Sequence, residues 1–167
     1  MISEVITNTE LYVGNASTKN LYAGGLIGLS KYVQISYSAS WGRIVPITNQ
    51  DVNVIRNVIR VGGLIGEIQE VAKVNNSYTI SSIVADSIAG EALKELEIGA
   101  LVGVVPNDAT AKNVNFSQVY YSSDYALFAD ENRVENVEIG TNLSAQVMHN
   151  DSSWKDLLRT EGENVND

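Results

Sequence analysis

The sequence predicts an all-β fold of stacked repeats, a β-solenoid or parallel β-helix. The pattern Gly-Gly-Leu-Ile-Gly occurs at Gly24–Gly28 and again at Gly62–Gly66, and a near copy occurs at Gly99–Gly103. The copies therefore begin 38 residues apart and then 37 residues apart. Self-similarity at such a period is typical of units that bury their apolar faces only by stacking. Each copy is also followed by a segment with the alternating pattern of a strand, which makes the fold all-β.

The strands follow the glycines in each unit. Apolar residues alternate with Ser, Thr or Asn, which is the pattern of a half-buried strand, over Val33–Ser38, Val74–Ile80 and Val114–Tyr120. The apolar pair between the glycines predicts a second, shorter strand. Glycine weakens a strand unless the backbone bends or a neighbour approaches closely, so we expect the glycines at corners and close contacts. Tyr37, Tyr78 and Phe116 occupy similar offsets and predict an aromatic stack between the repeats.

The array extends at both ends. Val5–Asn8 and Leu11–Val13 resemble the tail of an earlier unit, and Val137–Gly140 resembles a decayed fourth start. Ser87–Glu97 is interpreted as an insertion between strands. We therefore expect about three to four repeats in one domain, residues 1–150.

Residues 151–167 differ in character from the repeats. Ser153 and Asp156 have the spacing of a helix start, and Trp154, Leu157 and Leu158 fall on one helical face. An open end of a stacked array exposes apolar core and unpaired strand edges. The sequence thus predicts a short C-terminal capping helix, followed by an acidic tail without structure of its own.

The composition excludes several classes of function. The chain has 167 residues, a net charge of −9 and no cysteine. The acidity argues against nucleic acid as a partner, and the lack of cysteine excludes disulfides and zinc–sulfur sites. No apolar stretch reaches the about 18 residues of a membrane span, so we expect no membrane insertion. The N-terminus lacks the basic and apolar regions of a signal peptide.

The repeats are similar to a known family. Val61–Gly66 followed by Val74–Tyr78 (Val-Asn-Asn-Ser-Tyr) resembles the GLUG repeat of bacterial surface proteins. The likeness spans about residues 22–140. The first unit departs from the pattern at Ala23, and the third departs at Ala100 and Phe116. Gln146–Trp154 is similar to the Trp-ended segment that often closes such arrays.

The resemblance implies a location and a role rather than a reaction. GLUG arrays occur in adhesin-like proteins and in the non-catalytic part of immunoglobulin-A-cleaving metallopeptidases of streptococci. They imply a secreted or cell-surface location, no cofactor and no catalytic residue. We therefore expect a non-catalytic extracellular module of a larger bacterial protein. It would act as a spacer or scaffold beside other domains of the same protein, with adhesion or support of a metallopeptidase as a further role.

The sequence carries few signs of catalytic chemistry. The single histidine, His149, has no partner at a metal-ligand spacing, so we expect neither a catalytic nor a metal site. Glu67 and Glu70 stand where the other units carry no acid, and we interpret them as solvated charges. The glycine motif lacks the lysine and the spacing of a phosphate-binding loop. A carbohydrate-active β-helix enzyme is the second alternative, because parallel β-helices also include polysaccharide lyases and hydrolases.

The candidate binding residues are aromatic. Tyr120, Tyr121, Tyr125 and Phe128 lie within nine residues of each other and suit a host glycan or a matrix protein, which makes a binding module the first alternative. The structural explanation that we favour over this one places Tyr120 and Phe128 in the core and Tyr121 and Tyr125 on a loop. Asn-x-Ser triplets, such as those at Asn75 and Asn115, are attributed to composition alone.

Overall fold

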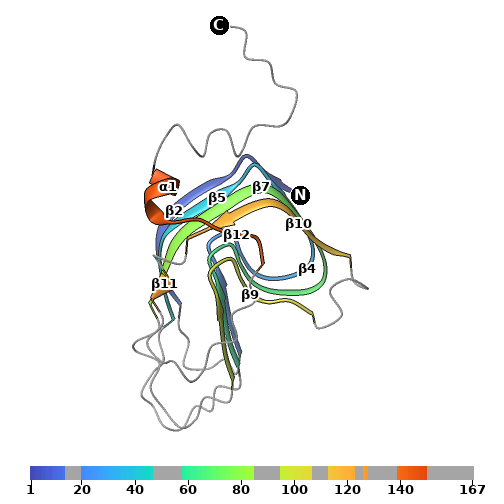
Figure 1. The fold of residues 1–167 in the computed structure, drawn as a ribbon. Coiled ribbons are helices and arrows are strands. Elements are labelled where there is room, and N and C mark those ends of the chain that lie inside the picture. Colours follow the sequence, from blue (N-terminus) through green and yellow to red (C-terminus); the bar gives the residue numbers. More distant parts are fainter. Residues whose placement is uncertain are drawn as a thin grey trace, which may run out of the picture.

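The protein is described by a computed structural model, which covers residues 1–13, 20–46, 58–84, 95–106, 113–122, 126–127 and 139–149. It consists of strands and one short helix (Figure 1). The elements are β1 (Ile2–Ser3), β2 (Ile6–Val13), β3 (Asn20–Gly24), β4 (Ile27–Ser36), β5 (Ala39–Pro46), β6 (Val58–Gly62), β7 (Ile65–Val84), β8 (Glu95–Gly99), β9 (Val102–Val104), β10 (Val114–Tyr121), β11 (Ala126–Leu127), β12 (Thr141–Asn142) and α1 (Ala145–His149).

The strands form two parallel sheets, which confirms the all-β prediction. One sheet has the order β3-β6-β8, and the other includes the path β1-β4-β7-β10-β12, with β2, β5, β9 and β11 joined to it. The three stretches 20–46, 58–84 and 95–122 are called repeats 1, 2 and 3. Equivalent residues of the repeats pair in register, so that Val61 lies between Ala23 and Ile98. In the same way Val74 lies between Ile35 and Phe116.

The segment before repeat 1 occupies the expected place. β1 pairs with β4 and β2 pairs with β5, both in parallel, so this segment corresponds to the second half of a unit. The predicted fourth start behaves differently. β12, which directly follows Gly140, pairs with the end of β10 rather than with β8 or β9, so Gly140 does not extend the column of glycine turns.

The glycine motif makes the turn from the first sheet into the second in every repeat. Successive turns are hydrogen-bonded to each other, because Gly25 N donates to the Gly63 carbonyl (3.0 Å) and Gly63 N donates to the Ala100 carbonyl (3.1 Å). A Cβ atom on Gly63 would lie 2.6 Å from Thr79 Oγ1. The motif therefore needs glycine for close packing of backbone against a neighbouring strand, as the sequence predicts.

A second corner in each repeat is formed without glycine. Glu4, Tyr37, Asn76 and Gln118 have φ angles of 58°, 48°, 45° and 52°. They follow residues that pair with one another, namely Ser3, Ser36, Asn75 and Ser117, so the four corners lie one above another. A left-handed backbone costs a non-glycine residue about 1–2 kcal/mol. Pairing on both sides of the corner holds the backbone there.

The apolar core has two main parts. The first lies inside the curve of β4, β7 and β10 (Figure 1) and includes Ile35, Leu64, Val74 and Leu101. The second, which includes Ile59, Ile83 and Ile98, joins the β3-β6-β8 sheet to the ends of β5 and β7. Apolar residues from equivalent positions of successive repeats fill both parts. This arrangement explains the period of the sequence.

The aromatic stack that the sequence predicts does not form. Tyr78 pairs with Tyr120, Phe116 pairs with Val74, and Tyr37 follows the residue that pairs with Asn75, so the prediction that Tyr37, Tyr78 and Phe116 stack is wrong. The three aromatic residues are therefore offset from one another by one or more positions along the paired strands. The capping helix predicted within residues 151–167 lies outside the described residues. A shorter helix, α1, precedes it, and Met148 packs on Ala39 and Tyr78.

Candidate functional site

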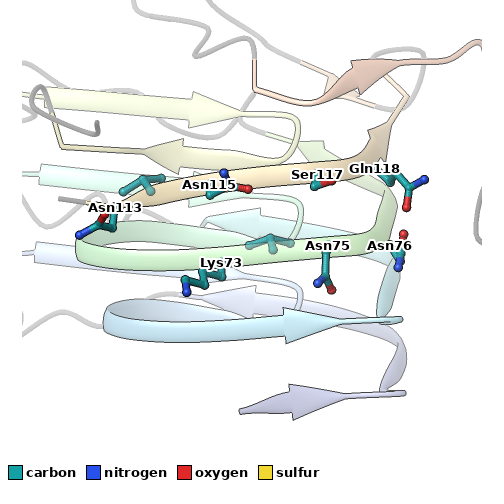
Figure 2. A pocket seen from close by; sticks show the side chains of 9 residues that line it. Lys73, Asn75, Asn76, Asn113, Asn115, Ser117 and Gln118 are labelled. Atoms are coloured by element: carbon teal, nitrogen blue, oxygen red, sulfur yellow. The ribbon is translucent and has the colours of Figure 1, made fainter. Parts of the chain in front are cut away.

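A polar depression of about 620 Å³ lies on the outer surface of β7 and β10. Two neighbouring strands contribute four polar side chains that point outwards (Figure 2), namely Lys73, Asn75, Asn115 and Ser117. Register places them in rows, since Lys73 pairs with Asn115 and Asn75 pairs with Ser117. These four side chains are exposed because every second residue of a strand faces away from the core. The full lining is Lys73, Val74, Asn75, Asn76, Asn113, Val114, Asn115, Ser117 and Gln118.

Asn76 differs from the other residues of this depression. It is only 6% exposed, yet its Oδ1 atom has no hydrogen-bond partner among the described residues. Its left-handed backbone, with φ of 45°, turns the side chain out of the alternating pattern of the strand. Buried amide oxygens almost always have a donor, so the covered Oδ1 atom of Asn76 lacks the partner that such an atom normally has.

A cluster of charges links the two sheets elsewhere. Arg60 in β6 donates from Nη1 to Glu67 Oε2 and from Nε to Glu97 Oε2, each at 2.5 Å. Gln69 Nε2 donates to Glu67 Oε1 at 3.2 Å. Both carboxylates therefore accept from the same guanidinium group, which neutralises one of their two charges. Such an arrangement stabilises the link between β6, β7 and β8.

The interpretation of Glu67 as a solvated charge is wrong. Glu67 is 7% exposed and ion-paired to Arg60, which is seven residues away in the chain and on the other sheet. Its register partners are Leu29 and Val104, so the expectation that carboxylates do not stack at this position is confirmed. Glu70 forms an ion pair of 3.4 Å with the exposed Lys31, as a surface charge would.

The predicted aromatic residues do not form an exposed cluster within the described part of the chain. Tyr121 is the last residue of β10 and is 9% exposed, so its placement on a loop is wrong. It packs in the core with Leu101 and Val119. Tyr120 is half-buried beside Tyr78. Tyr125 and Phe128 lie outside the described residues.

Tyr78 has a perturbed hydroxyl group. Burial raises the pKa of Tyr78 from 10.0 to about 12, because the charged phenolate is poorly solvated under α1. Tyr32 also has a raised pKa, and there the main cause is the hydrogen bond to Glu70. Tyr32 is 70% exposed. The pKa is therefore raised by burial at Tyr78 and mainly by a neighbouring carboxylate at Tyr32.

We expect alkali to destabilise the protein through Tyr78. Because its pKa is higher in the folded state, Tyr78 contributes stability below pH 10 that is lost as the pH rises towards 12. This rise in the pKa of Tyr78 corresponds to a loss of about 3 kcal/mol in the free energy of unfolding across the interval. Ultraviolet titration of tyrosinate should show a late step that disappears in Tyr78→Phe, whose free energy of unfolding should fall less over this interval. Tyr32→Phe should keep that late step and the decline; a Tyr78 that ionises near pH 10 would contradict the assignment.

Among the described residues, no three His, Cys, Asp or Glu side chains gather at a position that suits a metal ion. His149 is the last residue of α1. The helix found in these ranges is too short and too polar to cross a membrane.

Sequence reasoning missed both polar groups described above. The Arg60 cluster depends on contacts between sheets, for which the sequence carries no local signal. The polar depression has a signal in Asn113–Ser117 and in Asn75–Asn76, but in the sequence these residues indicate strands, the repeat pattern and Asn-x-Ser triplets rather than a site. The register of the repeats places these amides on one outer surface. Comparison of the chain with protein-family models, with curated proteins and with solved structures gave no match.

Proposed function

We propose that this chain is a β-solenoid module without catalytic activity, which spaces or presents other parts of a bacterial surface protein. The observation that carries the proposal is the parallel pairing of equivalent residues in successive repeats. Each repeat lengthens such a stack by one strand spacing and changes nothing else, which suits a spacer. The extracellular location rests on the resemblance of the repeats to GLUG units.

The arrangement of charge favours a scaffold over a carbohydrate-active enzyme. A glycosidase needs two carboxyl groups on opposite sides of a substrate bond. Glu67 and Glu97 are instead joined through Arg60. The outer rows of the polar depression contain amides, a hydroxyl and one lysine, which solubilise a sheet surface without supplying an acid or a base.

Duplicating one repeat tests the proposal. Residue Val58 pairs with Glu95, so residues 58–94 span one full period and a second copy can be inserted after residue 94. We expect small-angle scattering to show a particle that is longer by about 4.8 Å, the spacing of neighbouring strands. We also expect the free energy of unfolding to be unchanged or higher, because stability in repeat arrays adds with each interface.

A duplication of residues 65–101 is a useful second variant, because it has the same length and joins the repeats at the glycine turn. Its scattering profile should match that of the first insertion. A particle that widens instead of lengthening, or an insert that is cut by protease while the parent is resistant, would sink the solenoid proposal. Hydrolysis of a polysaccharide that Glu67→Gln abolishes would refute the absence of catalysis.

A further inference from the structure

We propose that the polar depression on β7 and β10 binds an oligosaccharide. This inference goes beyond the role of a spacer and does not depend on it, since it concerns one surface of two strands. Four asparagines, one glutamine, one serine and one lysine line the depression. Amides donate and accept hydrogen bonds from one planar group. They therefore match vicinal hydroxyls, which also do both.

Asn76 marks the end of this depression. Its buried Oδ1 atom lacks a donor, and in Figure 2 the amide oxygens of Asn76 and Gln118 (red) face each other. Two facing acceptors are stabilised by a donor placed between them. A sugar hydroxyl is such a donor, and it can accept a bond from Asn75 or Asn115 on its other side. Because the Asn76 Oδ1 atom is covered in the free protein, the exposed Gln118 side chain must move aside for a hydroxyl to reach it. We expect the ligand to be held most firmly at this point.

Other classes of ligand fit this surface less well. A metal ion such as calcium prefers carboxylate oxygens, and no carboxylate lines the depression. Nucleic acid needs several cations, whereas Lys73 is the single cation of the lining. A protein partner is usually held by an apolar centre. Here Val74 is buried and Val114 is half-buried, which leaves little apolar surface to cover.

The test is a titration of the full chain followed by nitrogen–proton correlation NMR, which observes side-chain amides directly. The probes are cellohexaose, chitohexaose and a hyaluronan hexasaccharide, each raised to about 10 mM, well above a millimolar Kd. They differ in acetamido and carboxylate groups. We expect at least one probe to shift the amide signals of Asn75, Asn76, Asn115 and Gln118, and an acidic probe to be favoured if Lys73 contributes.

Variants separate binding from folding. Asn76→Gly keeps the left-handed backbone and removes the amide, so we expect about tenfold weaker binding with an unchanged backbone spectrum. Asn115→Ala should weaken binding similarly. Gln34→Ala is the matched control, because Gln34 pairs with Lys73 and is also exposed but lies outside the lining. It should bind as the parent does.

Three outcomes would overturn the proposal. The first is the absence of amide shifts with all three saccharides. The second is a shift that Asn76→Gly and Asn115→Ala leave intact. The third is a response to a triple-helical collagen peptide and to none of the saccharides, which would assign the surface to a protein partner.

Discussion

Replacing Gly63 by alanine is expected to lower the free energy of unfolding by about 3 kcal/mol, as overpacking of a tight interior does. The added Cβ would lie 2.6 Å from Thr79 Oγ1 and closer still to the Ala100 carbonyl oxygen of the next repeat. Neither neighbour can retreat easily. Thr79 is held in a buried strand, and the Ala100 carbonyl accepts the hydrogen bond of Gly63 itself. Urea unfolding followed by circular dichroism measures the loss.

The natural control is the same position of repeat 3, which already carries alanine. Ala100 tolerates its methyl group because, in the described part of the chain, no further strand pairs with β8 or β9 on the outer side. Ala100→Gly should therefore change the free energy of unfolding by about 1 kcal/mol or less. Equal effects of Gly63→Ala and Ala100→Gly would contradict the role of close approach.

The contrast between these two positions shows what a periodic sequence can predict. Spacing of the glycines and alternation of the strands depend on residues close in the chain, and both follow from backbone geometry. They indicate strands in the regions of β4, β7 and β10 and the turn at Gly63. The corner at Tyr37 could not be predicted, because a bulky residue disfavours the left-handed conformation and only pairing with neighbouring repeats enforces it.

The candidate sites were less predictable than the fold. The residues next to Tyr121 in the sequence do not indicate whether its side chain faces the solvent or the core. Its burial depends on its position at the end of β10 and on packing with Leu101, which is distant in the sequence. Asn75 and Asn115 were visible as repeated residues. Their position on one outer surface depends on the pairing of Val74 with Phe116, which are 42 residues apart. The glycine motifs are 38 and 37 residues apart, so their spacing does not predict this pairing.

We expect Arg60→Met to lower the free energy of unfolding by about 3 kcal/mol. The substitution removes the partner of Glu67, which is 7% exposed, and an unpaired buried charge is strongly destabilising. Arg60 also holds Glu97 of repeat 3, so the loss should loosen the β6–β8 pairing. Hydrogen exchange of the β8 amides should rise together with the fall in stability measured by urea unfolding.

A second substitution separates the effect of the Arg60–Glu67 ion pair from the effects of the two side chains taken singly. Repeat 1 carries Tyr22 and Leu29 in register with Arg60 and Glu67, which shows that the fold accepts an uncharged pair there. Adding Glu67→Leu to Arg60→Met should restore about 2 kcal/mol, a coupling expected of residues in contact. Lys31→Met, which breaks the exposed pair with Glu70, should cost less than about 1 kcal/mol. If Glu67→Leu fails to rescue Arg60→Met, the destabilisation comes from packing of the arginine side chain and not from the charge that it neutralises.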